Sequence, residues 1–205
     1  MRMLGMFHEA NDDVVKAQEI YLDLFEQNVA DTQTIKRLVA LYRDMEMYPM
    51  AITILNKFIE TNQEDTEAWH ELADLYLSKQ NFSKALYCYE EILAHQPHNY
   101  LVTLRYAEIL YSSNRSDRLN DLENARKYFA HAAVLKTGGA EEPCVRALFG
   151  VIRSCKQIEK MAKRDDPKNG EIMQTAQLNL QTYYQTKKNA CKGELIASKL
   201  PCLQV

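Results

Sequence analysis

The sequence predicts an all-α protein, built as a solenoid of helical repeats with extra helices at its C-terminal end. Only 6 Gly and 5 Pro occur among 205 residues, which is too few for the many turns of a β-sandwich or barrel. The hydrophobic share of 46% is enough for a buried core. Ala17, Ala51 and Ala85 are spaced by 34 residues, each within an amphipathic segment. A fixed period of this size is typical of a solenoid.

The clearest repeat unit begins near Thr66 and closes at Pro97. One face of its first expected helix carries Trp69, Leu72, Ala73 and Tyr76, and one face of its second carries Ala85, Tyr89 and Ile92. This order resembles the tetratricopeptide-repeat pattern, with Ala73 in place of the usual glycine. The small residues would let two antiparallel helices approach closely, and the large ones would fill the space between pairs. We therefore expect these residues to form core rather than a catalytic site.

The repeat register divides the chain into an array and an extension. Residues 1–137 form the tetratricopeptide-repeat array, with units at about 1–31, 32–65, 66–99 and 100–137, and residues 138–205 form a C-terminal helical extension with a frayed tail. The last unit carries extra residues at 114–120, which we expect to protrude as a loop. Two further helices are expected, from about Pro143 to Arg164 and from Glu171 onward, with a break over 165–170.

The charge balance disfavours nucleic acid as a partner. With 25 basic and 28 acidic side chains the net charge is -3, so the basic footprint that contacts phosphates is absent from the composition. Residues 1–150 carry 15 basic and 23 acidic side chains (net -8), whereas 151–205 carry 10 basic and 5 acidic (net +5). This asymmetry indicates either a functional basic end or two differently solvated helical surfaces.

The cysteines and the apolar runs bear on the compartment of the protein. The five cysteines are Cys88, Cys144, Cys155, Cys191 and Cys202. An odd number without a Cys-x-x-Cys pair predicts free thiols in a reducing compartment. A charge interrupts the N-terminus before an apolar run of signal-peptide length, so we expect no secretory leader. No stretch approaches the ~20 apolar residues that cross a bilayer, so no direct transmembrane segment is expected.

The search for catalytic motifs favours a protein that is not an enzyme. There is no phosphate-binding glycine-rich loop, Gly-x-Ser-x-Gly elbow or Cys-x-x-Cys pattern. His70 and Glu71 resemble the start of a zinc-peptidase helix, but Asp74 stands where the second His belongs. His95 and His98 flank a turn, where solvated side chains are favoured over a metal site. We expect no catalytic, cofactor-binding or metal-binding residues.

The candidate functional surface is the concave side of the solenoid. In such repeats the second, fifth, ninth and twelfth positions of each unit face this groove. The candidate partner-binding residues are Lys36, Arg43, Glu67, His70, Asp74, Leu101, Leu104, Glu108 and Tyr111. A chaperone tail ending in a carboxylate is disfavoured, because Asp74 and Glu108 would repel it.

An apolar stripe is expected within this surface. Leu101, Leu104 and Tyr111 recur at intervals of three and seven on one helix, which places them on one face. If they are exposed, they mark a contact surface for a partner segment. The alternative is that the helices from Pro143 onward fold back over them.

Several stretches go beyond the generic repeat pattern. They are Glu67–Tyr76, Pro97–Tyr100, Tyr106–Glu108, Ala125–Ala132 and Arg146–Gly150. In them the chain resembles, over roughly residues 2–190, the family of subunit 2 of the endoplasmic-reticulum membrane protein complex. Of these stretches, 97–100 and 146–150 are not required by the repeat fold, so they make the resemblance specific.

The resemblance implies a non-catalytic scaffold subunit at the cytoplasmic face of the endoplasmic-reticulum membrane. Such a subunit would be peripheral, held through the cytosolic segments of other subunits. The complex of that family inserts tail-anchored and multipass membrane proteins. The alternative is an independent cytosolic adaptor that binds a peptide or helix of a partner in its groove.

Overall fold

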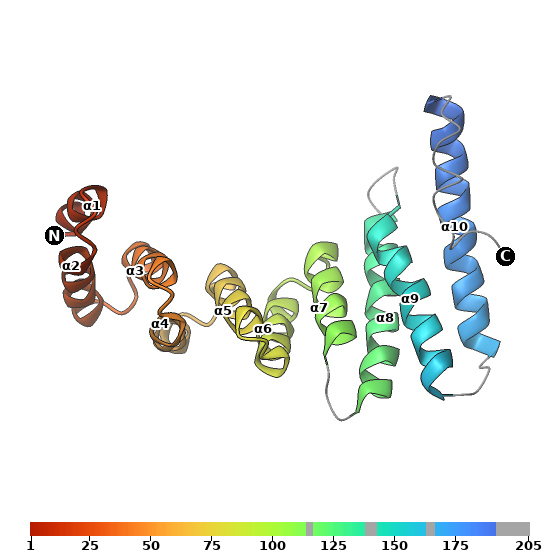
Figure 1. Cartoon of the computed structure of the whole chain (residues 1–205), viewed down its shortest axis with the longest axis horizontal. Helices are drawn as coiled ribbons and strands as arrows, with labels where there is room; N and C mark the ends of the chain where they lie inside the picture. Colours follow the sequence, from red (N-terminus) through yellow and green to blue (C-terminus); the bar gives the residue numbers. More distant parts are fainter. Residues whose placement is uncertain (114–116, 138–142, 163–166, 192–205) are drawn as a thin grey trace. The chain divides into compact units, whose positions relative to one another are not determined.

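The computed structural model describes residues 1–113, 117–137, 143–162 and 167–191. In these ranges the regular structure is entirely α-helical, which confirms the predicted all-α class. The helices are α1 (Arg2–Ala10), α2 (Val14–Gln27), α3 (Thr32–Asp44), α4 (Tyr48–Thr61), α5 (Thr66–Ser78), α6 (Phe82–His95), α7 (Tyr100–Ser112), α8 (Arg118–Thr137), α9 (Val145–Ala162) and α10 (Pro167–Cys191) (Figure 1). They fall into two compact units, Met1–His95 and Gln96–Val205.

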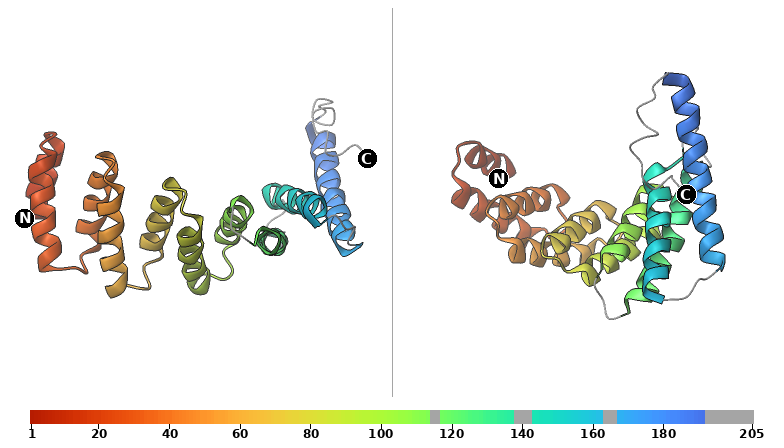
Figure 2. Two further views of the ribbon diagram at one scale, coloured as in Figure 1. Left: turned by 60° about the horizontal axis from the view of Figure 1, so that its bottom comes forward. Right: turned by 45° about the vertical axis from the view of Figure 1, so that its right-hand side comes forward.

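Unit 1 consists of three helix pairs, α1–α2, α3–α4 and α5–α6. Contacts within each pair alternate with contacts of α2 with α3 and of α4 with α5, so each pair stacks on the next (Figures 1 and 2). Ala17, Ala51 and Ala85 are each 0% exposed on the second helix of their pair. A small side chain at this place lets the helices approach closely, as the 34-residue spacing predicts. The larger core residues predicted for the middle unit are also buried, namely Trp69, Leu72, Tyr76, Tyr89 and Ile92.

The first helices share a capping residue at the same spacing. Asp31, Asp65 and Asn99 stand directly before α3, α5 and α7, again 34 residues apart, and each side chain accepts a backbone N–H of the first turn. Because the first N–H groups of a helix have no partner within it, such a cap is worth about 1 kcal/mol. The cap residues therefore fix where α3, α5 and α7 begin.

The turns inside the pairs repeat as well. Asp12, Glu46 and Gln80 have φ of 59°, 58° and 56°, the left-handed region that ends a helix. In each case the next N–H donates back to a carbonyl five residues earlier, as from Asn81 to Tyr76 at 2.8 Å. The same backbone turn thus reverses the chain in all three pairs of unit 1.

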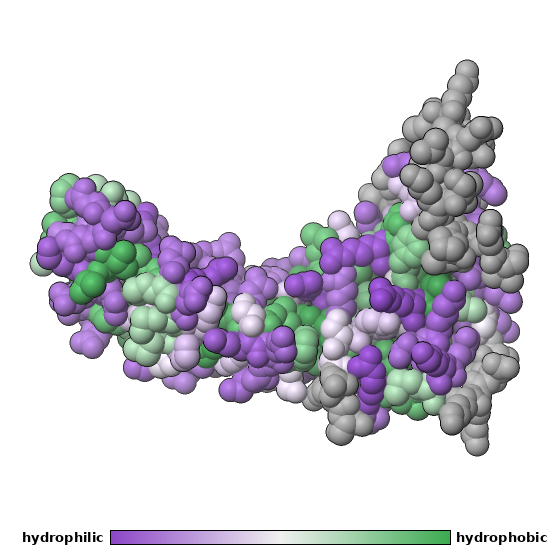
Figure 3. Space-filling model, in the orientation of Figure 1, coloured by the Kyte–Doolittle hydropathy of each residue, from purple (hydrophilic) through white to green (hydrophobic). Residues whose placement is uncertain are grey.

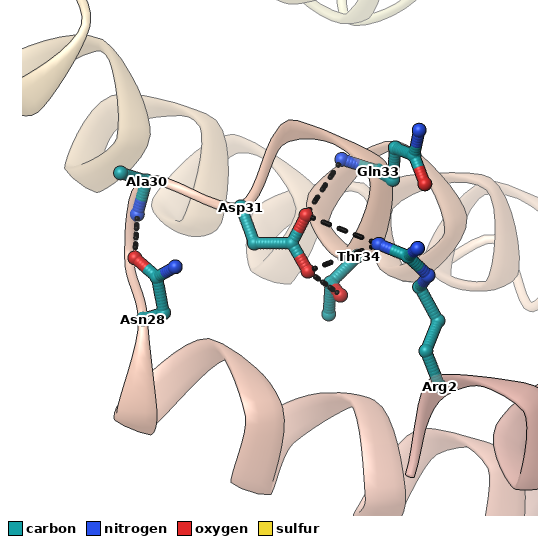
Figure 4. A network of polar contacts seen from close by, with 6 residues as sticks. All are labelled: Arg2, Asn28, Ala30, Asp31, Gln33 and Thr34. Carbon is teal, nitrogen blue, oxygen red and sulfur yellow. Dashed lines mark hydrogen bonds and ion pairs between the residues drawn. The ribbon is translucent and has the colours of Figure 1, made fainter.

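Asp31 also links α3 to α1 (Figure 4). Its carboxylate accepts from the Thr34 hydroxyl and from the backbone N–H of Gln33, and Arg2 Nη1 lies 3.4 Å from Asp31 Oδ1. The Thr34 hydrogen bond holds the pKa of Asp31 below its usual value of 3.8, against the opposing effect of partial burial. The carboxylate therefore stays charged at neutral pH, and both the cap and the contact with Arg2 are maintained.

In unit 2, the helices α7, α8, α9 and α10 lie side by side in that order (Figure 1). The contact between α8 and α9 depends on Gly150, because a Cβ built there would lie 2.4 Å from the Phe129 ring. The predicted break over 165–170 is wrong from Pro167 onward, because α10 begins at that residue. Proline is well accommodated in a first helical turn, which explains this start. Residues 163–166 lie outside the described residues.

Asn169, placed by sequence in that break, is a buried polar link between three helices. It is 0% exposed, accepts a hydrogen bond from Arg126 of α8 at 2.6 Å, and donates to the Cys155 carbonyl and the Glu159 carboxylate of α9 at 3.1 and 2.8 Å. The side-chain oxygen and nitrogen of Asn169 therefore both have hydrogen-bond partners, as buried polar groups require. Asn169 thereby holds the first turn of α10 against its neighbours.

The extra residues at 114–120 do not all form a loop. Helix α8 begins at Arg118 and has 20 residues, whereas α4 and α6 have 14 each. Arg118 donates to the Ser113 carbonyl at 2.8 Å, and the Ser113 hydroxyl donates to Asp121 at 2.7 Å. These bonds extend α8 at its start, while residues 114–116 lie outside the described residues. The division into an array to residue 137 and an extension beyond it stays a prediction.

Three cysteines are free thiols within the core. Cys88, Cys144 and Cys155 are buried and unpaired with one another. Burial raises the pKa of the Cys88 thiol to about 12. This agrees with the prediction of free thiols for these three, whereas the side chains of Cys191 and Cys202 lie outside the described residues. In the described ranges, no helix has both the length and the apolar character to cross a membrane.

Candidate partner-binding surface

The predicted contact residues of unit 1 lie on α3 and α5, and two of them pair with each other. Lys36 on α3 forms an ion pair with Glu67 on α5. On the same helix as Glu67, burial raises the pKa of the Glu71 carboxyl, while the positive charges of Lys36 and Arg43 oppose this change. Lys36 and Glu67, both predicted to bind a partner, thus partly compensate each other's charge within unit 1.

The other predicted residues of unit 1 divide between core contact and surface. The His70 ring packs edge-on against Tyr89 of α6, with ring centroids 5.6 Å apart. Arg43 and Asp74 are exposed. In the described part of the chain, no group of three or more His, Cys, Asp or Glu side chains is placed to hold a metal ion. The residues around His70 therefore form a structural contact and a polar surface.

The expected apolar stripe on α7 does not exist as one exposed surface. Leu101 is 58% exposed, but Leu104 is only 4% exposed, and Tyr111 is half-buried. Seven of the 13 residues of α7 are buried, because this helix contacts both α8 and α9. A helix covered on two sides buries more than the single face assumed from the repeat register. Leu104 is a core residue, so Leu104→Asp would destabilise unit 2 instead of testing a surface.

Two of the predicted residues, Glu108 and Tyr111, line a pocket between α7 and α9. Its volume is about 440 Å³. The lining residues are Arg105, Glu108, Tyr111 and Ser112 of α7, Phe129 of α8, and Arg146, Phe149, Gly150 and Arg153 of α9. We call this the α7–α9 pocket. It is a concave site lined by aromatic and charged side chains, a composition typical of binding sites.

The charged groups of the α7–α9 pocket form a defined network. The Glu108 carboxylate accepts hydrogen bonds from Arg146 Nη2 at 2.7 Å and from Arg105 Nη1 at 3.2 Å. Arg153 lies over the Tyr111 ring, with its guanidinium carbon 5.7 Å from the ring centroid. Two arginines thus neutralise Glu108, so it is not the free repulsive carboxylate expected from the sequence.

Sequence reasoning missed the α9 half of this pocket. The repeat register fades before α9, so it assigned no groove position to Arg146, Phe149 or Arg153. The sequence nevertheless contains a signal, because the repeat fold does not require the residues from Arg146 to Gly150. Three residues of that stretch line the pocket.

Figure 3 shows apolar surface at the end of unit 1 that α1 and α2 form, and exposed apolar side chains lie on α1. Met3, Leu4 and Phe7 are 79%, 47% and 61% exposed. Exposed apolar faces often mark contact surfaces. The side chains of this face give no charge pattern that selects an occupant, in contrast to the α7–α9 pocket.

The stacked helix pairs, the 34-residue period and the small residues at the pair contacts together define a tetratricopeptide-repeat protein. Solved structures of this fold are similar to the chain. They include the MamA protein, with a TM-score of 0.60, 15% identity and coverage of 93% of this chain and 92% of that one. Another is YrrB, described as a tetratricopeptide-repeat protein with an unusual peptide-binding site, with a TM-score of 0.57, 12% identity and coverage of 85% and 80%.

The family is more specific than the fold. The model described as "EMC2 TPR-like repeat domain" matches residues 1–117, and the chain belongs to this family. Subunit 2-B of the ER membrane protein complex of Xenopus laevis is 34% identical over 162 residues, covering 79% of this chain and 52% of the relative. Subunit 2 from Dictyostelium discoideum is 29% identical over 200 residues, covering 95% and 61%. The chain spans about half the length of the Xenopus relatives that it matches.

Membership of this family also bears on catalysis. The family is one of tetratricopeptide-repeat proteins, which act as scaffolds or adaptors and not as enzymes. The chain is accordingly a non-catalytic repeat protein, as the absence of catalytic motifs in its sequence predicts.

Proposed function

We propose that the chain is a scaffold subunit of the endoplasmic-reticulum membrane protein complex, facing the cytosol and held at the membrane by other subunits. Through this complex it serves the insertion of tail-anchored and multipass membrane proteins. Family membership carries the proposal, because the family model covers residues 1–117 and several relatives bear the name of this subunit.

The proposed contacts with other subunits lie along the first helices of the repeats. Arg43, Asp74 and Leu101 are exposed at the expected groove positions of α3, α5 and α7. Glu108 and Tyr111 contribute from the α7–α9 pocket. Lys36 and Glu67 would contribute as a pair, since a partner must either accept their ion pair or break it. Unit 1 thus supplies polar contact residues, and unit 2 supplies polar and aromatic ones, which suit a cytosolic protein segment.

The independent cytosolic adaptor remains the alternative function. The similarity in fold to YrrB, whose description includes a peptide-binding site, favours it. An adaptor would bind a soluble partner's peptide in the same groove without being part of a membrane complex. The two functions differ in whether the chain associates with integral membrane subunits or with soluble partners.

Affinity purification from detergent-solubilised membranes tests the proposal. We expect the tagged chain to fractionate with membranes and to co-purify the integral membrane subunits of that complex, identified by mass spectrometry. A tagged MamA-like repeat protein processed in parallel controls for non-specific capture. Recovery of the chain only from the cytosolic fraction, with soluble partners alone, would overturn the proposal in favour of the adaptor.

A further inference from the structure

The α7–α9 pocket carries an excess of positive charge. Its lining includes three guanidinium groups, from Arg105, Arg146 and Arg153, and one carboxylate, from Glu108. Glu108 is engaged by two of these arginines. In the described part of the chain, no carboxylate pairs with Arg153, whose side chain is exposed and lies over Tyr111. The pocket therefore attracts negative charge, although the chain as a whole has a net charge of -3.

The pocket also offers apolar surface beside this charge. The aromatic rings of Tyr111, Phe129 and Phe149 contribute to its walls. A volume of about 440 Å³ accommodates a few side chains, not a folded domain. An occupant that matches both features combines carboxylates with a neighbouring apolar side chain.

We propose that the α7–α9 pocket binds an acidic segment of a partner protein in which an aromatic residue lies next to carboxylates. The carboxylates pair with Arg153 and with the free N–H groups of Arg146, because a planar guanidinium offers more donors than Glu108 can accept. The aromatic side chain packs against Phe149 and Tyr111. The inference deepens the proposed function by naming the chemistry of the segment that is bound.

The structure favours such a segment over nucleic acid or a free phosphate. Nucleic acid requires an extended basic surface along its backbone, whereas here the three arginines converge on one concavity. A free phosphate would use the guanidinium groups but leave the aromatic walls unoccupied. An acidic protein segment satisfies both parts of the pocket.

Fluorescence anisotropy with defined peptides and the purified 205-residue chain tests the proposal. The probe is a fluorescein-labelled peptide with Asp-Phe-Glu in a Gly-Ser frame, amidated at its C-terminus so that only side chains carry negative charge. We expect it to bind about tenfold more tightly than the same peptide with Asn-Phe-Gln, because charge-assisted hydrogen bonds are lost in the latter. Replacement of its Phe by Ser is expected to weaken binding by about fivefold.

A matched pair of variants locates the binding site. Arg153→Gln removes one charge from the pocket and should weaken binding of the acidic peptide by about tenfold. Lys156→Gln removes one charge from the same helix, at an exposed residue outside the pocket lining, and should change binding by less than about twofold. Circular dichroism melting of both variants checks that the fold is unchanged.

Three results would overturn the proposal. Equal affinity for the acidic and amide peptides would exclude recognition of carboxylates. Equal losses for Arg153→Gln and Lys156→Gln would show non-specific attraction instead of a site. Displacement of the peptide by inorganic phosphate, at an ionic strength matched with chloride, would assign the pocket to phosphate. Because no membrane component enters this assay, its failure is distinguishable from failure of the proposed membrane scaffold.

Discussion

Replacing Ala85 with glutamate is expected to unfold unit 1. Ala85 is 0% exposed on α6, the partner of α5 in its helix pair. A glutamate there adds volume at a close helix contact and places a charge where no partner compensates it. Overpacking costs about 1–3 kcal/mol and an uncompensated buried charge several more, which together approach the ~5–15 kcal/mol stability of a typical domain. Urea denaturation followed by circular dichroism measures the loss.

Ala94→Glu is the matched control. Ala94 lies on the same helix and is exposed, so the same substitution there should change the unfolding free energy by less than about 0.5 kcal/mol. If Ala85→Glu and Ala94→Glu melted alike, Ala85 would not lie at a helix contact and the assigned repeat register would be wrong.

Trp69→Ala is expected to cost about 3–5 kcal/mol, the range for truncating a buried large aromatic side chain. Trp69 is 7% exposed, its indole N–H donates to the Gln63 carbonyl at 2.9 Å, and its ring meets Tyr87 edge-on at 6.0 Å. The change removes packing and leaves the Gln63 carbonyl without this donor. Since Trp69 is the one tryptophan of the chain, unfolding is followed by circular dichroism instead of fluorescence.

Trp69→Phe separates packing from hydrogen bonding. Phenylalanine retains much of the ring volume but loses the donor, so a smaller loss of about 1–2 kcal/mol is expected. A Trp69→Ala variant that melts like the parent, yet no longer binds a partner, would instead make Trp69 a binding residue.

The repeat part of the fold could be predicted because its signals recur within the sequence. Alanines 34 residues apart marked the helix contacts, and all three are fully buried. The same spacing also relates the helix caps and the turns. The cap residues Asp31 and Asp65, and the left-handed turn residues Glu46 and Gln80, repeat with the same period.

The features that could not be predicted depend on contacts between segments outside one repeat. Leu104 was expected in the groove, but its exposure is set by all the helices that contact α7, not by the periodicity of α7 alone. The start of α10 depends on Asn169, whose hydrogen bonds reach α8 and α9. A local pattern of turn-forming residues does not contain those partners.

For the same reason, only the α7 residues of the candidate site could be predicted from the sequence. The repeat register identifies Glu108 and Tyr111. Their charge and surroundings, however, depend on contacts with residues of α9. Arg146 lies 38 residues after Glu108 and turns an expected repulsive carboxylate into a neutralised one. Arg153 adds the positive charge that defines the chemistry of the pocket.

Site-specific photo-crosslinking in cells tests most directly the central claim, that this repeat protein holds a membrane-complex subunit through its α7–α9 pocket. The crosslinker p-benzoylphenylalanine replaces Ser112, an exposed residue at the pocket, or Lys127, an exposed residue of α8 outside the pocket lining. We predict a crosslink from position 112, but not from 127, to a subunit of the endoplasmic-reticulum membrane protein complex, at an acidic segment and in the membrane fraction. Crosslinks from 112 only to soluble proteins, or equal crosslinks from both positions, would contradict the account.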